Sequence, residues 1–195
     1  MISKKYYDNS LRYEMLMKFP FKNIMDVPKI EKIQLNFGFP NISQDKKQII
    51  IGLLALEMIT GQKAYPTQSK KQIHTLKIRK KMYVGSSVTL RKNSMYFFLD
   101  KLIFVIFSNL RTFNGFHAKY NVKNRSISFQ LQDLYIFPEL EREYHLFQKL
   151  PLLDITIVFE DKVIFKKHKD ISIMFGRMLQ IPLVKYNKDI QAKVA

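Results

Sequence analysis

The residues of this chain best suited to chemistry are cations, in a stretch from 70 to 92 that reads KKQIHTLKIRKKMYVGSSVTLRK. It holds eight Lys or Arg and no Asp or Glu, with strand-forming apolar residues between the charges. Lysine and arginine at this density bind phosphate, and each phosphate they neutralise on a nucleic acid releases a counterion. The stretch therefore indicates contact with a polyanion.

Catalytic chemistry has no comparable support in the sequence. Cysteine is absent, which excludes disulfides, thiolate metal sites and a cysteine nucleophile. No two of the four histidines stand three or four residues apart, and no glycine-rich phosphate loop is present. We expect no enzyme activity, no metal and no cofactor.

The excess positive charge is concentrated in the middle of the chain. The formal net charge is +17, and residues 58–132 hold fourteen Lys or Arg against one acid, Asp100. Self-repulsion of this size destabilises a compact chain unless a polyanion relieves it. Nucleic acid is the first candidate. The alternative is a basic peripheral protein bound to an anionic membrane surface, which requires an amphipathic helix with lysines on one side.

The apolar pattern predicts an α+β fold with an antiparallel sheet and helices packed against it. Helices are expected at 4–18, over the apolar stripe from Ile49 to Ile59, at 94–108 and at 169–180. Strands are expected at 30–37, 64–68, 83–91, 126–132 and 152–160, with 112–126 polar and irregular. The segment between the second and third strands is too long for a tight turn, so we predict a long, ordered basic loop there.

Six motifs, in order, resemble one known family. They are VPKIEKIQLNFG (27–38), ITGQKAYPTQSKK (59–71), LKIRKKMYVGSSVTLR (76–91), RTFNGFHAK (111–119), IFPEL (136–140) and LDITI (153–157). The chain resembles the bacterial-type large-subunit ribosomal protein number five, the 5S-rRNA-binding protein of the central protuberance. The expected organisation is a single domain over 1–195, family-like over 1–183, with a polar tail at 184–195.

The resemblance implies the site residues and the partners. The expected partners are 5S rRNA, large-subunit rRNA, the P-site tRNA and neighbouring ribosomal proteins, including a small-subunit head protein touched through the 111–150 region, and no membrane. The rRNA-binding residues that it implies are Lys29, Lys32, Asn36, Gln62, Lys63, Lys70, Lys71, Thr89 and Arg91. The residues that it implies for the tRNA-contacting loop are Ile73, His74, Lys77, Arg79, Lys80, Lys81 and Gly85.

Composition also suggests a compartment. Lysine far outnumbers arginine, and isoleucine and phenylalanine are frequent, which is typical of an AT-rich coding sequence. The resemblance begins by Tyr6, so we expect no cleavable presequence. These features favour a protein encoded and used in the mitochondrial matrix, with a plastid or a bacterial cytoplasm as the alternatives.

Overall fold

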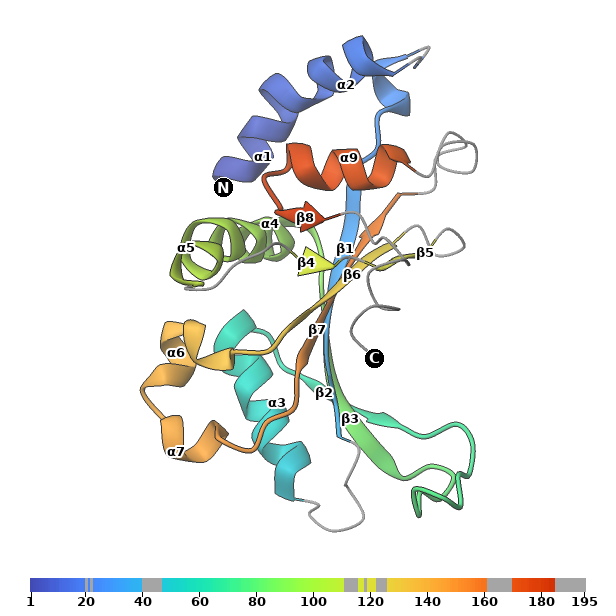
Figure 1. Cartoon of the computed structure of the whole chain (residues 1–195), viewed down its shortest axis with the longest axis vertical. Coiled ribbons are helices and arrows are strands. Elements are labelled where there is room, and N and C mark those ends of the chain that lie inside the picture. The colour runs from blue at the N-terminus through green and yellow to red at the C-terminus, as the bar shows by residue number, and fades with distance from the viewer. Residues whose placement is uncertain are drawn as a thin grey trace, which may run out of the picture. The chain divides into compact units, whose positions relative to one another are not determined.

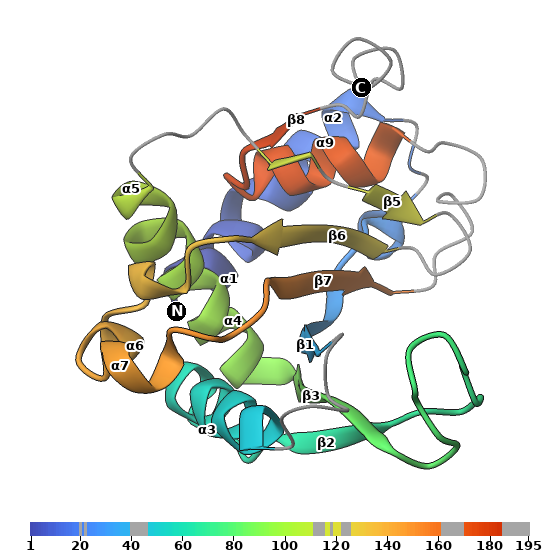
Figure 2. The same cartoon turned by 60° about the horizontal axis from the view of Figure 1, so that its bottom comes forward.

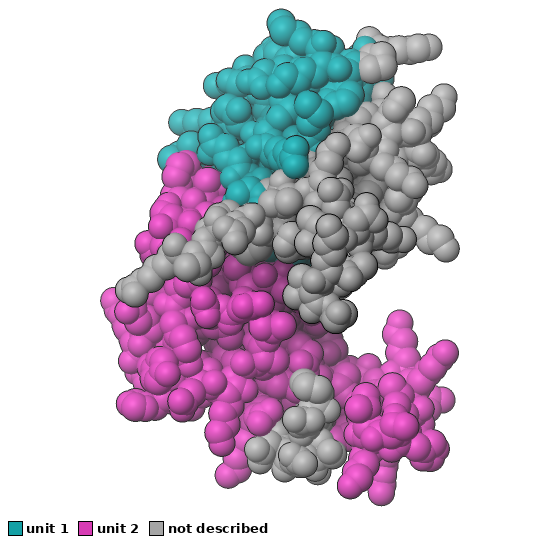
Figure 3. All heavy atoms as spheres, viewed as in Figure 1, with its two compact units in different colours: residues 1–31, 111–129, 156–195 teal, residues 32–110, 130–155 magenta. Residues whose placement is uncertain are grey.

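A computed structural model describes residues 1–19, 21, 23–39, 47–110, 116–117, 119–121, 126–160 and 170–184. The chain divides into two compact units (Figure 3). Unit 1 holds residues 1–31, 111–129 and 156–195, and unit 2 holds residues 32–110 and 130–155. A single domain over 1–195 stays a prediction, and the tail from residue 185 lies outside the described part of the chain.

The main sheet is antiparallel, and its strand order is β2-β3-β1-β7-β6-β5. Its strands are β1 (Ile30–Gly38), β2 (Tyr65–Gln68), β3 (Tyr83–Leu90), β5 (Lys119–Asn121), β6 (Ser126–Leu131) and β7 (Leu153–Phe159). Five of these strands lie close to the ranges predicted from the alternation of apolar residues. Together with the helices, the sheet confirms the predicted α+β class.

In unit 2, β3 lies between β2 and β1, and the helix α3 (Lys47–Thr60) packs on it (Figure 1). The apolar side chains of β1, from Ile33 through Leu35 to Phe37, are buried, as the alternation predicted. Their partners in β3 include Leu90 and Val88, which are buried too. One face of these strands therefore forms the core of the unit.

The remaining helices of unit 2 follow β3 and β6. The predicted helix at 94–108 is divided into α4 (Lys92–Lys101), the π-helical η3 (Leu102–Ile106) and α5 (Phe107–Asn109). It begins at Lys92 with no side-chain cap, two residues earlier than expected. The short elements η4 (Leu134–Ile136), α6 (Pro138–Glu141) and α7 (Tyr144–Phe147) follow β6, and α6 and α7 contact α3.

Unit 1 is held together by aromatic contacts around Tyr7. The predicted N-terminal helix consists of α1 (Ile2–Tyr6), the π-helical η1 (Tyr7–Leu11) and α2 (Arg12–Lys18), and the 3₁₀ turn η2 (Ile24–Asp26) follows. The buried Tyr7 hydroxyl donates to the Pro28 carbonyl at 3.0 Å, and its ring meets Phe175 edge-on. Phe175 belongs to α9 (Asp170–Met178), the predicted final helix, and also packs on Phe159 of β7.

The predicted irregular region at 112–126 contains short strands. β4 (Phe116–His117) pairs in parallel with β8 (Leu183–Val184), and β5 pairs with β6. Strands of only two or three residues are too short to show a periodic pattern in the sequence, so the alternation of apolar residues could not reveal them.

The close approach of α3 to β3 depends on Gly52. A Cβ at this position would lie 2.5 Å from Phe39 Cζ and 3.0 Å from Ser86 Oγ, and both residues are buried. At Gly38, the last residue of β1, an added Cβ would have no heavy atom within 4 Å apart from those of its neighbours in the chain.

We predict that Gly52→Ala lowers the free energy of unfolding by about 1–3 kcal/mol, because the methyl group overpacks the interface between α3 and β3. Urea unfolding measures this change, with Gly38→Ala as the control that has space for the methyl group. A Gly52→Ala variant at least as stable as the wild type would contradict this packing.

Candidate nucleic-acid interface

The side of β1 and β3 that faces away from α3 is polar. Ser86 faces α3, so the alternate residues Ser87 and Thr89 face the other way. In the antiparallel register Asn36 lies opposite Ser87, and Gln34 lies opposite Thr89. Partners in register project to the same side of a sheet, so Gln34 and Asn36 join Ser87 and Thr89 on one surface. We call this surface, extended by Gln62 and β2, the polar sheet face.

Gln62 reaches this face from the end of α3. Gly61 terminates the helix with a positive φ of 66°, as its place in the sequence predicted, and its N–H donates to the Glu57 carbonyl. The Thr60 hydroxyl accepts from the Gln62 N–H at 3.2 Å, and Gln62 Nε2 donates to the Thr89 carbonyl at 3.2 Å. The structure thus brings together Asn36, Gln62 and Thr89, the three polar residues that the resemblance indicated.

The predicted basic residues near this face differ in their surroundings. Lys63 follows Gln62 and is exposed. Lys32 and Arg91 flank the Ile33–Leu90 pair at the end of the β1–β3 ladder, Lys32 partly buried and Arg91 exposed, and both engage other residues. Lys29 belongs to unit 1, where its carbonyl accepts from the Glu160 N–H.

The connection from β2 to β3, Ser69–Met82, forms a projecting hairpin that we call the basic arm (Figure 2). Its base is closed by the Ser69 N–H donating to the Met82 carbonyl at 2.8 Å. Further out, Ile73 and Ile78 exchange two backbone hydrogen bonds of 3.0 Å, and Lys77, with φ of 54°, closes the turn onto His74. Backbone hydrogen bonds thus order the arm, helped by the Ser69 hydroxyl, which donates to the Lys71 carbonyl, and the charged side chains are not needed to hold it.

The charged side chains of the basic arm are all exposed. They are Lys70, Lys71, Lys77, Arg79, Lys80 and Lys81, and none of them forms an ion pair with another residue that the structure describes. His74 and Ile73 are exposed as well, whereas Ile78 is buried. Gly85 lies outside the arm, buried in β3 opposite Gly38 and Thr67.

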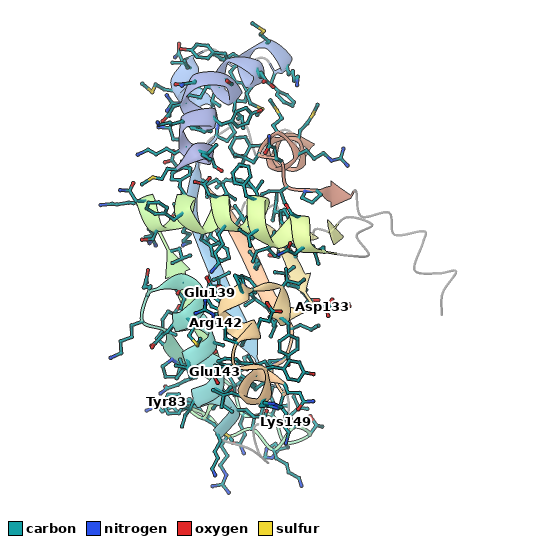
Figure 4. The ribbon with its side chains drawn as sticks, turned by 90° about the vertical axis from the view of Figure 1, so that its left-hand side faces the viewer. Tyr83, Asp133, Glu139, Arg142, Glu143 and Lys149 are labelled. Carbon is teal, nitrogen blue, oxygen red and sulfur yellow. The ribbon has the colours of Figure 1, made fainter. Side chains whose placement is uncertain are left out.

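Acidic residues gather elsewhere, on the segment that carries α6 and α7 (Figure 4). The segment 133–152 contains Asp133, Glu139, Glu141 and Glu143 against Arg142 and Lys149. Its exposed apolar side chains are Tyr144, Leu146 and Leu152. We call this surface the acidic segment.

Partial burial, and then the neighbouring Tyr144 phenol, raise the pKa of Tyr135.

Lys101 connects the acidic segment to the end of α3. Its Nζ donates to Glu139 Oε1 at 2.7 Å and to the Ile59 carbonyl at 3.1 Å, and lies 5.6 Å from the centre of the Phe137 ring. A cation at a helix C-terminus is favoured by the helix dipole. Lys101 thus fixes the last turn of α3, just before Gln62. No sequence pattern indicated this role, because the contacts of Lys101 lie 38 and 42 residues away.

Neither a metal cluster nor a membrane-spanning helix accompanies these surfaces. In the part of the chain that the structure describes, no group of three or more His, Cys, Asp or Glu side chains could hold a metal ion. None of the helices described is both long and apolar enough to cross a membrane.

Comparison with known proteins identifies the class as ribosomal. The family described as "Ribosomal protein L5" matches residues 23–79, and the C-terminal region of the same ribosomal family matches residues 83–191. Among similar proteins, large ribosomal subunit protein uL5m of Reclinomonas americana is 42% identical over 93% of this chain and 97% of its own. Protein uL5 of Borreliella afzelii is 39% identical, and uL5c of Tetradesmus obliquus 41%, each over 80% of this chain and 84% or 85% of its own.

This chain belongs to the uL5 family of large-subunit ribosomal proteins. It is a structural constituent of the large ribosomal subunit, and its partners are rRNA and other ribosomal proteins. The family assignment confirms the resemblance found in the sequence and the expectation that the chain is not an enzyme.

We predict that Lys101→Met lowers the free energy of unfolding by about 1–3 kcal/mol, since a charge-assisted hydrogen bond and a helix-terminal carbonyl both lose their donor. Glu139→Gln costs less, because Lys101 keeps the Ile59 carbonyl. Urea unfolding gives both values, and amide exchange at Gly61 and Gln62 should quicken only in Lys101→Met. The exposed Lys149→Met is the control, and equal stability of all three variants would contradict this role of Lys101.

Proposed function

We propose that the polar sheet face binds 5S rRNA. The observation that carries this proposal is the convergence of Asn36, Gln62 and Thr89 from two strands and a helix end onto one surface. Amides and hydroxyls at fixed positions recognise base edges, ribose hydroxyls and phosphate oxygens together. In this proposal Lys32, Lys63, Lys70, Lys71 and Arg91 of unit 2 supply phosphate contacts around them, and Lys29 of unit 1 supplies a further phosphate contact.

The basic arm is proposed to contact the P-site tRNA through Lys77, Arg79, Lys80 and Lys81. Support comes from its projection away from the sheet (Figure 2), its order without help from its charged side chains, and six exposed cations that have no acidic partner in the described chain. Charges that would otherwise repel each other are stabilised when phosphates lie between them.

The acidic segment is proposed to meet a small-subunit head protein. It is the part of unit 2 least suited to RNA, because carboxylates repel phosphate, and its exposed apolar residues favour a protein partner. The partner should then present a basic surface. Parts of the 111–150 region expected to make this contact, residues 111–115, 118 and 122–125, lie outside the described residues.

The mitochondrial matrix is the proposed compartment. The relative from Reclinomonas americana, a uL5m, matches over most of both chains, but the plastid-type uL5c and the bacterial uL5 match nearly as closely. A plastid or a bacterial cytoplasm therefore remains the alternative. Binding to an anionic membrane surface gains no support, because the unpaired cations lie on a hairpin and not on an amphipathic helix.

We predict that the polar sheet face and the basic arm have separable roles. Asn36→Asp with Gln62→Glu and Thr89→Glu should abolish binding to 5S rRNA in a filter-binding assay, because three carboxylates would face phosphate. Lys80→Glu with Lys81→Glu should leave that binding within about twofold but slow translation by ribosomes that carry the variant. The site assignment is wrong if the triple variant binds like the wild type, or if the arm variant loses 5S rRNA.

We further predict that Glu141→Lys with Glu143→Lys weakens the association of large with small ribosomal subunits, measured by light scattering, while 5S rRNA binding is kept. Lys149→Glu changes charge in the opposite sense on the same segment and serves as the control. Unchanged association of the double-lysine variant would exclude the acidic segment from the contact.

A further inference from the structure

Tyr65 is an exposed aromatic residue of the polar sheet face, and its neighbours in register there are polar. It lies in β2 opposite Ser87, and Ser87 lies opposite Asn36, so these three residues form one row across three strands. Its side chain is 47% exposed, and that side chain has no hydrogen bond or ring contact with any described residue. The core therefore does not account for this ring.

The exposed ring of Tyr65 suits a nucleobase. With strands about 4.8 Å apart, the backbones of Tyr65 and Asn36 are roughly 10 Å apart across Ser87. Ser87 is fully buried: its hydroxyl donates to the Leu35 carbonyl at 3.1 Å and accepts from Gln34 Nε2 at 3.5 Å, so Ser87 itself presents no surface to a ligand. An aromatic ring stacks at centroid distances of about 4.5–7 Å. A base stacked on the exposed ring of Tyr65 would lie outside the side chains that cover Ser87, on the face that also carries Asn36.

The place of β2 gives such a base access. β2 is the last strand on its side of the sheet, and Pro66, which lacks an N–H, follows Tyr65 there. The side of Tyr65 away from β3 therefore has no neighbouring strand among the residues described. Bases that stack on protein aromatics come from loops and bulges, because bases in a duplex are already stacked.

We propose that Tyr65 is a stacking platform for an unpaired base of the bound RNA, with Asn36 reading the edge of that base. The inference rests on the proposed binding of 5S rRNA to the same face and adds the kind of nucleotide recognised there. It assigns to Tyr65 an affinity that does not depend on charge.

The test uses the full chain and a 5S rRNA transcript. Tyr65→Ala should weaken binding about 5- to 150-fold, the range for the loss of one stacked base. Tyr65→Phe should bind within about twofold of the wild type, whereas Tyr65→Leu, which keeps apolar bulk without a π-face, should bind like Tyr65→Ala. The slope of affinity against salt should be the same in all four proteins, because stacking releases no counterion. Lys63→Ala should make that slope shallower.

A fluorescence measurement makes the test independent of affinity. The chain contains no tryptophan, so Tyr65→Trp introduces a single indole. Its emission should be quenched by 5S rRNA and not by a fully paired RNA duplex. Circular dichroism and thermal unfolding of each variant check that the exposed substitutions leave the fold intact.

The outcomes separate this inference from the function it rests on. If wild-type protein fails to bind 5S rRNA, the proposed function is wrong and the inference falls with it. If wild-type protein binds, but Tyr65→Ala or Tyr65→Leu binds as tightly, or the indole is not quenched, then Tyr65 does not stack and the proposed function stands without it.

Discussion

The pairing register of β1 with β3 is the constraint on which the rest of this structure depends. It sets Leu35 opposite Val88 on the side that packs under α3, and it sets Asn36 opposite Ser87 on the other side. A slip by one residue would exchange the two faces, burying amides and exposing the core. Burial of the apolar face thus fixes the register, and the register fixes the positions of the polar groups on the opposite face.

The cations of the basic arm take no part in the contacts that order it. The basic arm is ordered by backbone hydrogen bonds, from the Ser69–Met82 closure to the Ile73–Ile78 bridge, so its lysines remain free of internal partners within the described chain. Lys101 shows the opposite use of a cation, partly buried and holding the end of α3 against Glu139. The acidic segment and the basic arm are separate in the sequence. This separation agrees with a different partner for each surface.

The sequence predicted those features that depend on the spacing of apolar residues and on residue type. Alternation from Ile33 to Phe37 predicted β1 and its buried face, and Gly61 correctly marked the end of α3. The spacing of apolar residues could not predict the π-helical turns at Tyr7–Leu11 and Leu102–Ile106, because these residues fit an α-helix equally well. Contacts between distant residues were also hidden. The sequence contains Gln62, Thr89 and Lys101, but only the folded chain shows that Gln62 meets Thr89 and that Lys101 holds the preceding helix end.

The central claim is that this protein and RNA are electrostatic complements, and the salt dependence of binding tests it most directly. Affinity of the wild-type chain for 5S rRNA should be measured from about 50 to 400 mM monovalent salt. Five or six phosphate contacts by the lysines and arginine around the polar sheet face predict a slope of log affinity against log salt of about −4, at roughly 0.7–0.9 per phosphate. A slope near zero, or no binding at low salt, would contradict the account.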